Sequence, residues 1–436
     1  MTAPSFTQSS SDHMNSPSLT NPEAEIRQGN DCVSAIAETP SSTSSIEERR
    51  ADQSLNWSVW PSSRGEDALA MWRRLDARLG KRDCASGATW TDCWLRAYGD
   101  LVPHEFHFAE SNGQLRGICL VTRGVGQKSG PFPIRTRHLG TAGEPMPGGV
   151  CVEYNRPLIE PGYEAAFLTE LVSRMTEGRD WDQVRFDGVS IEDAQQIQSL
   201  LPGIEIRERS SWYFDLAAAR SQGEEILSRL GRSTRSNIRR RLKKYGELEC
   251  TWAENIEQAE EIFRELVELH QARWQSVGEP GAFASERFHG FQSEAALRLF
   301  LEGQGVLFRV RHQGETVGCL FLLIDRNRML DYLSGFASFE EKPSPGLITH
   351  YLCMEHALKR GFDAYDFLVG EKRHKENLST EVTQLCWLTA TRPSLKMSLL
   401  QAAQSWKRKL SALRKGSHSH TDASDSEILD DSNQQN

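Results

Sequence analysis

Two patterns of apolar residues alternate along this chain of 436 residues and predict its secondary structure. Apolar positions that recur every three or four residues predict helices, as in Ala68–Leu79, Tyr163–Met175 and Ile256–Val277. Short unbroken apolar runs predict strands, and the longest of them, Val317–Ile324, has the length of a strand. A membrane-spanning helix needs about 18 apolar residues. The pattern therefore predicts a soluble protein of the α/β class.

The predicted elements form two groups of similar size. Strands of the first group are predicted at Glu105–Ala109, Leu115–Thr122, Arg135–Leu139, Cys151–Ile159, Gln183–Phe186 and Ile206–Leu216. The second group is predicted to run strand, helix, helix, three-strand meander, helix, strand, loop, strand, helix. Its predicted elements are Leu248–Trp252, Ile256–Val277, Phe288–Gly303, Val306–Arg311, Thr316–Asp325, Met329–Phe336, a helix opening at Ser344, Asp363–Leu368, Glu381–Thr391 and Leu395–Leu413.

The polar ends of the chain set the predicted domain limits. Residues 1–56 are rich in Ser, Thr, Asn, Pro and Glu, so they bury too little apolar surface to offset the entropy lost on ordering. The polar, acidic tail 416–436 has the same character. We therefore predict disordered termini around two modules, 57–216 and 217–415.

The stretch Leu330–Lys375 predicts a strand, a helix and a parallel strand, with an anion site at the start of the helix. Ser344 is expected as the N-cap, Pro345 at the first helical position, and Gly346 where no side chain blocks a ligand. Free backbone N–H groups and the positive end of the helix dipole suit a pyrophosphate. An ordinary helix start explains the same residues, so this motif alone does not decide the function.

A second unusual segment, Gly231–Lys244 (GRSTRSNIRRRLKK), carries seven basic residues and no acid. With Ser233 as N-cap, Arg235 and Arg239 fall on one helical face. The segment is either a solvated basic face, a nucleic-acid patch or a wall for a phosphorylated ligand. Aromatic residues are not interleaved with the cations, and we favour an anionic small molecule.

Composition narrows the function classes. A formal charge of −9 argues against a general nucleic-acid binder. Nine cysteines without a CxxC pair indicate reduced thiols in a cytoplasmic protein, and no signal peptide or metal-binding motif is predicted. His350, His356 and His374 are expected to be ordinary surface residues.

The second group of elements resembles the GNAT acyltransferase core. From Glu205 to about Lys375 it is more specifically similar to the CelD-like branch, named after a cellulose-biosynthesis protein and related to Fem-type aminoacyltransferases. The matching pieces are Thr234–Leu242 (TRSNIRRRL), Leu269–Trp274 (LHQARW), Gly281–Phe288 (GAFASERF), Tyr332–Gly335 (YLSG), Ser344–Leu347 (SPGL) and Tyr365–Lys375 (YDFLVGEKRHK). The resemblance implies two tandem GNAT-type modules, with mixed sheets flanked by helices and a degenerate first module.

The resemblance also implies a site for acyl-CoA between the fourth and fifth strands, with no metal. The residues implied to bind the cofactor are Leu333, Ser334, Gly335, Ser344, Pro345, Gly346 and Leu347. Asp366, Glu371 and Lys375 are the implied catalytic residues, although Asp366 is equally explained as a strand carboxylate paired with a nearby cation. His270, Arg273 and Trp274, with Arg235 and Arg239, are expected to bind the acceptor.

Two departures from the family pattern affect the acceptor side. His374 stands where an aromatic residue is usual, and Val152–Asn155 reads Val-Glu-Tyr-Asn where an aspartate-containing motif is expected. The leading hypothesis is acyl transfer from acyl-CoA to an amine or hydroxyl, on a sugar nucleotide or exopolysaccharide precursor. The alternatives are aminoacyl transfer from charged tRNA, with the basic segment contacting the tRNA, and a non-catalytic protein that retains the fold.

Overall fold

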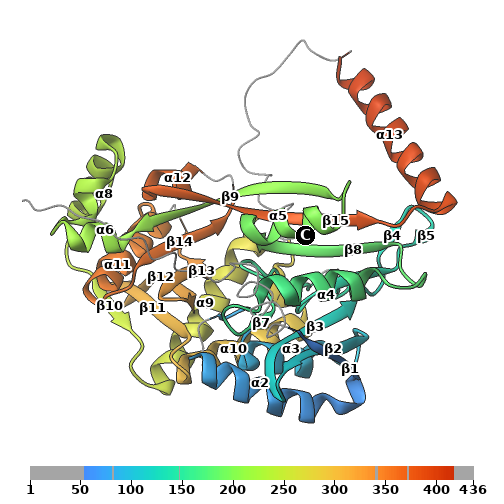
Figure 1. The fold of residues 1–436 in the computed structure, drawn as a ribbon. Coiled ribbons are helices and arrows are strands. Elements are labelled where there is room, and N and C mark those ends of the chain that lie inside the picture. Colours follow the sequence, from blue (N-terminus) through green and yellow to red (C-terminus); the bar gives the residue numbers. More distant parts are fainter. Residues whose placement is uncertain (1–53, 81–82, 147, 339–341, 371–372, 417–436) are drawn as a thin grey trace, which may run out of the picture. The chain divides into compact units, whose positions relative to one another are not determined.

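Thirteen strands form one mixed sheet in the computed structural model, which describes residues 54–80, 83–146, 148–338, 342–370 and 373–416 (Figure 1). The strands of this sheet are β1 (Asn56–Pro61), β2 (His104–Ser111), β3 (Gln114–Arg123), β6 (Thr136–Leu139), β7 (Leu158–Ile159), β8 (Gln183–Ser190), β9 (Glu205–Asp215), β10 (Glu249–Trp252), β11 (Gly305–His312), β12 (Glu315–Asp325), β13 (Arg328–Phe336), β14 (Ala364–Val369) and β15 (Glu381–Thr391). A separate short pair is formed by β4 (Lys128–Ser129) and β5 (Phe132–Pro133).

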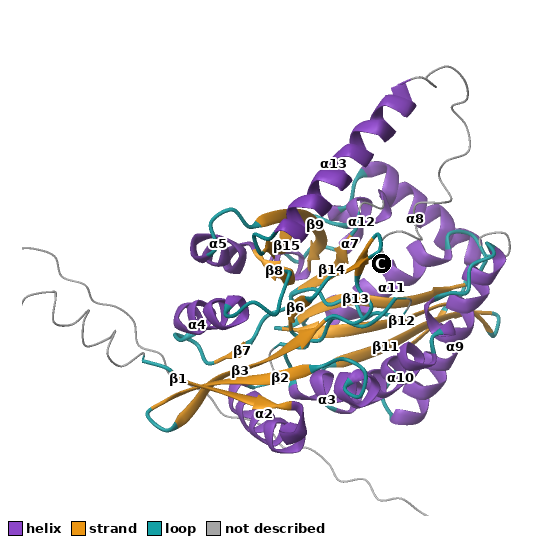
Figure 2. Cartoon of the chain, turned by 90° about the vertical axis from the view of Figure 1, so that its right-hand side faces the viewer, coloured by secondary structure: helices purple, strands orange, loops and turns teal. Residues whose placement is uncertain are grey.

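Helices cover the sheet. They are α2 (Gly65–Leu79), α3 (Ala88–Tyr98), α4 (Glu164–Thr176), α5 (Ile191–Leu200), α6 (Leu216–Ser221), α7 (Ile226–Arg229), α8 (Arg232–Tyr245), α9 (Ile256–Ser276), α10 (Glu286–Leu301), α11 (Pro345–Lys359), α12 (Arg373–Leu378) and α13 (Leu395–Gly416), with short 3-10 turns at Ser62–Arg64 and Ala282–Ala284. The predicted α/β class, a mixed sheet flanked by helices, is confirmed (Figure 2).

The sheet runs without a break across the boundary predicted near residue 216. The strand order is β1-β2-β3-β6-β8-β15-β9-β14-β13-β12-β11-β10, with β7 added beside β3. Two of the recorded strand pairs are parallel, β6 with β8 and β13 with β14, and each is connected through a helix, α4 or α11. The same strand–helix–strand unit thus occurs once in each half. The two halves interlock, because β15 lies between β8 and β9.

The apolar run predicted as a strand is buried on both faces. In β12, Phe321 and Leu323 pack into the core under α9 and α10, whereas Leu320 and Leu322 pack into the core under α11. Alternate residues of a strand point to opposite faces, and a strand covered on both faces therefore needs a continuous apolar sequence. This arrangement explains why Val317–Ile324 has no polar position.

Several local predictions are wrong. Within Cys151–Ile159 only Leu158–Ile159 is a strand, because the chain turns inward there: the side-chain N–H of Asn155 donates to the carbonyls of Leu139 (3.0 Å) and Asp187 (3.1 Å). The N-cap of α8 is Gly231, which places Ser233 inside the first turn.

His350 is also not a surface residue. It is buried, and its Nδ1 lies 2.9 Å from the hydroxyl of Tyr365. Burial lowers the pKa of this imidazole to about 3, which keeps it neutral at ordinary pH. The predicted tails 1–56 and 416–436 lie almost wholly outside the described residues, as does the backbone of Glu371.

Candidate active site

The parallel pair β13–β14 parts soon after it forms. Cα partners are recorded for only three positions, from Arg328 with Ala364 to Leu330 with Asp366. Strand β13 continues to Phe336, but Leu368 in β14 has φ +59° and the register of β14 against β9 shifts at this point. A non-glycine residue with positive φ breaks the extended path of a strand. The two strands therefore diverge beyond Leu330.

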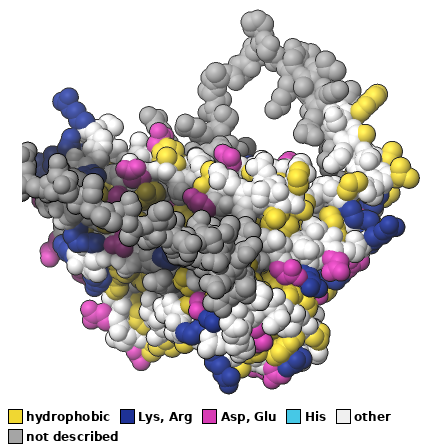
Figure 3. Space-filling model, in the orientation of Figure 1, with side chains coloured by type: hydrophobic (Ala, Val, Ile, Leu, Met, Phe, Trp, Pro, Cys, Tyr) yellow, Lys and Arg dark blue, Asp and Glu magenta, His cyan; other side chains and the backbone are white. Residues whose placement is uncertain are grey.

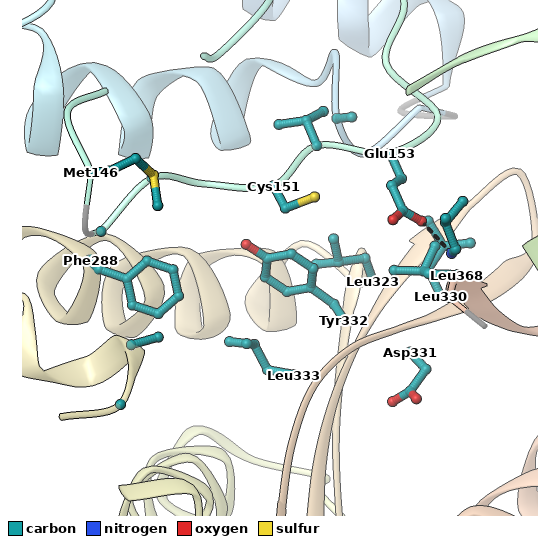
Figure 4. A pocket seen from close by; sticks show the side chains of 18 of the residues that line it. Met146, Cys151, Glu153, Phe288, Leu323, Leu330, Asp331, Tyr332, Leu333 and Leu368 are labelled. Atoms are coloured by element: carbon teal, nitrogen blue, oxygen red, sulfur yellow. Dashed lines mark hydrogen bonds between the residues drawn. The ribbon is translucent and has the colours of Figure 1, made fainter. Parts of the chain in front are cut away.

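A cavity of about 330 Å³ begins where these strands diverge (Figure 4). Leu330–Leu333 of β13 and Leu368–Gly370 at the end of β14 line it from one side. The segment Cys151–Glu153 lines it from the other side, and in Figure 4 this segment passes across the cavity from the β13 residues. Trp274 and Phe288 complete an apolar wall. The cavity therefore combines an apolar lining with a few polar groups, as ligand sites do.

Glu153 is an acid of this cavity with a shifted pKa. One of its carboxylate oxygens, Oε2, accepts a hydrogen bond from the backbone N–H of Val369 at 2.8 Å. Burial raises the pKa of Glu153, the Val369 bond and Lys375 lower it, and nearby Asp366 raises it, so that the resulting pKa is about 7. A carboxylate with a pKa near 7 can take up a proton at neutral pH.

Lys375 lies beside Glu153 and lines the same cavity. Its ammonium donates to the carbonyl oxygens of Val369 (2.9 Å) and Leu368 (3.4 Å). A Cβ on Gly370 would lie 2.8 Å from this Nζ, so the glycine leaves the space that the lysine occupies. The divergent end of β14 therefore holds an acid and a cation together. A backbone N–H group of β14 binds the acid, and backbone carbonyl groups of β14 bind the cation.

Part of the chain that forms this site matches a known family. Residues 232–376 match the model of the family described as an acetyltransferase (GNAT) domain. The match covers about a third of the chain, and this segment is similar to a GNAT domain. The matched segment includes the diverging strands, helix α11 and Lys375, whereas Glu153 lies in the sequence before it. The comparison with curated proteins gives no match.

The chain is also similar to solved structures. FemX shares 12% sequence identity at a TM-score of 0.49, with 77% of this chain and 97% of that chain covered. A conserved protein of unknown function from Bacteroides thetaiotaomicron VPI-5482 shares 12% sequence identity at a TM-score of 0.46. The match covers 78% of this chain and 100% of that chain. A tandem GNAT protein from the clavulanic acid biosynthesis pathway, solved without AcCoA, shares 12% sequence identity at a TM-score of 0.41. The match covers 78% of this chain and 100% of that chain.

Asp366 was expected as a base, but its surroundings differ from those a base needs. Its side chain is fully buried, and its Oδ2 accepts hydrogen bonds from Tyr154 (2.5 Å) and Arg328. Oδ1 accepts from Ser211 (2.9 Å) and from the backbone N–H of Leu368 (2.8 Å). These four donors occupy both oxygens, and Asp366 is not among the described residues that line the cavity. The geometry favours a positioning role for Asp366 rather than proton transfer.

The residues expected to bind the cofactor divide into two sets. Leu333 lines the cavity, and Gly335 is packed against α9, where a Cβ would lie 2.4 Å from the carbonyl oxygen of Leu266. At the start of α11, Ser344 is at the N-cap position with φ +55°, but among the described contacts its side chain makes no capping bond. Of the described cavity lining, Ser344–Leu347 form no part. These residues mark a second location, next to Phe336 at the C-terminal end of β13 and outside the described cavity lining.

The residues expected to bind the acceptor are not all together. Trp274 lines the cavity and donates from its indole N–H to Nε2 of His270 at 3.1 Å. His270 is buried behind it, and burial lowers its pKa to about 4, so it accepts this bond as a neutral ring. Arg273 is exposed one residue before Trp274. Arg235 and Arg239 belong to α8, which packs against α11, and neither lines the cavity as its described residues define it.

Sequence reasoning missed Glu153 as a site residue. The only signal was indirect, since Glu153 lies in the segment that departs from the family pattern. In the part of the chain that the structure describes, no group of His, Cys, Asp or Glu is arranged to hold a metal ion.

Proposed function

We propose that this protein transfers an acyl group, acetyl in the simplest case, from acyl-CoA to an amine or hydroxyl in the cavity of Glu153 and Lys375. The observation that carries the proposal is the position of that cavity. It opens where β13 and β14 part, inside a segment that matches the GNAT domain model. Bound acyl-CoA would supply a thioester carbonyl as the electrophile.

Glu153 acts as the general base in this proposal. It removes a proton from the acceptor as the nitrogen or oxygen of the acceptor forms the new bond to the acyl carbon and the carbon–sulfur bond breaks. Oε2 is held by the N–H of Val369, which leaves Oε1 as the oxygen that takes the proton. Its raised pKa suits this role, because a base with a pKa near the working pH is both deprotonated and basic enough.

Lys375 stabilises negative charge beside Glu153. An ammonium held by two backbone carbonyls has a fixed position, so it can attract the oxyanion that develops on the acyl group or an anionic part of the acceptor. Cys151 lines the same cavity, but its surroundings raise the pKa of the thiol to about 12. A neutral thiol is a poor nucleophile, and we therefore assign direct transfer without an acyl-cysteine.

The donor would extend from the cavity toward the start of α11. Leu333–Gly335 would face the acyl end, and Ser344–Leu347 would hold the pyrophosphate on the first backbone N–H groups of the helix. Helix α8 packs against α11, and Arg239 is close enough to influence the pKa of Tyr351 on α11. The basic helix is thus nearer to this second location than to the described cavity lining.

The acceptor class rests on the resemblance to the CelD-like branch, which favours a sugar nucleotide or exopolysaccharide precursor. Aminoacyl transfer from charged tRNA is the second candidate, and the observation that favours it is the basic, largely exposed helix α8. The two differ in their donor. Thermal denaturation of the purified chain with acetyl-CoA, CoA or charged tRNA separates them.

Stabilisation by acetyl-CoA and not by tRNA would support the proposal. Stabilisation by charged tRNA alone would support aminoacyl transfer instead. Stabilisation by neither ligand would support a non-catalytic protein that retains the fold. Native mass spectrometry of the freshly purified protein tests the donor independently, because a co-purified CoA species would appear as a discrete mass increment.

A further inference from the structure

Among the contacts of the described side chains, helix α13, the last described element, is held to the rest of the protein by its first turns. Met397 and Leu400 are buried against Ile134 in a small core of their own, and the ammonium of Lys396 forms an ion pair with Asp182 at 2.7 Å. From there the helix extends away from the strands (Figures 1 and 2). Its first turns are thus fixed in place, while its later turns project beyond the sheet.

The projecting helix carries an exposed apolar stripe. Leu395 is 87% exposed, Leu399 72% and Trp406 72%, and Ala402 between them is also exposed. Figure 3 shows hydrophobic side chains standing out from this part of the surface. The spacing of these residues keeps them on one side of a helix, and Leu410 and Leu413 continue it in the sequence. Exposed apolar stripes of this kind mark interaction surfaces.

The charge of the same helix identifies the kind of partner. Its 22 residues contain six basic side chains and no acidic one, in a chain whose formal charge is −9. The basic residues are Lys396, Lys407, Arg408, Lys409, Arg414 and Lys415. An apolar stripe that includes a Trp, in a helix whose sequence contains many cations, is typical of helices that lie in the surface of an anionic membrane.

We propose that α13 binds the surface of an anionic lipid bilayer, with Leu399 and Trp406 inserted between the headgroups. The alternatives fit less well. A second copy of α13 would bring two strongly cationic helices together, and a nucleic acid would not use the apolar stripe. Within the described residues no helix is long and apolar enough to cross a membrane, so the binding is peripheral. The proposal is independent of the acyl-transfer reaction.

Co-sedimentation of the full chain with vesicles tests this proposal. We expect sedimentation with vesicles of phosphatidylcholine and phosphatidylglycerol, and much less with phosphatidylcholine alone. The double variant Leu399→Glu, Trp406→Glu should lose more than about tenfold in partitioning, because it removes two large apolar side chains from the bilayer surface. Replacing Lys407, Arg408 and Lys409 by Gln should remove the preference for the anionic lipid and its dependence on salt.

Leu301→Glu is the matched control. Leu301 ends α10 and is 68% exposed, so the control makes the same substitution at a similarly exposed leucine on another surface. It should sediment as the unchanged protein does. Equal sedimentation of the double variant would overturn the proposal. The proposal would also be overturned if light scattering without vesicles showed a dimer that the double variant does not form. Binding of an oligonucleotide without any binding of vesicles would overturn it as well.

Discussion

Glu153 and Tyr154 are neighbours in the chain, yet they line different cavities. Glu153 faces the cavity of about 330 Å³, and Tyr154 faces a second, more polar cavity of about 430 Å³. Tyr154 has φ +55°, so the chain bends sharply between the two side chains. The hydroxyl of Tyr154 donates to Asp366, and Arg328, which also lines the larger cavity, donates to the same carboxylate. The network of Asp366 therefore fixes the turn that presents Glu153.

Asp366→Ala should destabilise the fold by about 3–5 kcal/mol, because it leaves the Arg328 guanidinium and several buried donors without their acceptor. Urea denaturation measures the loss of free energy. Asp363→Ala is the control: Asp363 immediately precedes β14 and pairs with Arg220 at the surface, so its loss should change stability by less than about 1 kcal/mol. Equal effects of the two variants would contradict a structural role for Asp366.

The pH dependence of the reaction should report Glu153. The base must be deprotonated, so kcat/KM should rise with pH and level off above about 7, where burial has placed the pKa. Stability responds in the opposite direction. The folded pKa is raised from 4.5, so the contribution of Glu153 to stability is complete below pH 4.5 and is lost as pH rises through about 7.

Glu153→Gln should lower kcat by about 10²–10⁴-fold and remove this rise with pH, while acetyl-CoA binding by calorimetry stays unchanged. Glu144→Gln is the matched control. Burial also raises the pKa of Glu144 to about 7, but its carboxylate accepts from the indole of Trp94 and is outside the described cavity lining. A pH profile that disappears in Glu144→Gln and persists in Glu153→Gln would assign the base to Glu144.

Gly370→Ala should reduce activity by up to about 100-fold with little change in stability. The new methyl group would lie 2.8 Å from Nζ and 3.1 Å from Cε of Lys375, and the flexible end of the lysine would move away from the site. Gly290→Ala on the exposed face of α10 meets no atom within 4 Å and should retain full activity. Steady-state rates with melting temperatures test both variants. An active Gly370→Ala would mean that the position of Lys375 is unimportant.

Local patterns were sufficient to predict the elements of the second half. The meander β11–β13, helix α11 and strand β14 lie where continuous apolar runs and Pro345 indicate them. Each of these signals depends on residues that are close in sequence. The apolar runs are also continuous because both faces of the sheet are buried. Leu333, Trp274 and Lys375, which the family resemblance implied as site residues, all line the cavity.

The pairing of distant segments could not be predicted in the same way. Strand β15 was expected, but its insertion between β8 and β9 depends on edges that form only when the sheet assembles. Glu153 was missed for a related reason. It lies in an irregular turn where burial raises its pKa, and its hydrogen-bond partner Val369 is 216 positions away in the sequence. Asp366 was predicted as a base because its type and strand position suit one, but its partners come from three separate elements.

The proposed pyrophosphate site at α11 can be tested with two substitutions at Gly346. A Cβ at this position would lie 3.3 Å from the ring of Phe336, so Ala and Asp impose the same small displacement of that ring. Only Asp adds a negative charge, which should repel a pyrophosphate. Gly346→Asp should therefore bind acetyl-CoA at least about tenfold more weakly than Gly346→Ala, by a difference of about 1.4 kcal/mol or more in calorimetry.

Loss of the helix would not explain that difference. An acidic residue in the first turn of a helix is favourable to its dipole, so Gly346→Asp should not melt α11 relative to Gly346→Ala. The gap between the two variants should also shrink at high salt, since it arises from charge repulsion at an accessible site. Equal affinities at low salt would show that the phosphates of the donor bind elsewhere. The basic face of α8, which packs against α11, would then be the place to look, and Arg239→Glu would be the variant that weakens binding.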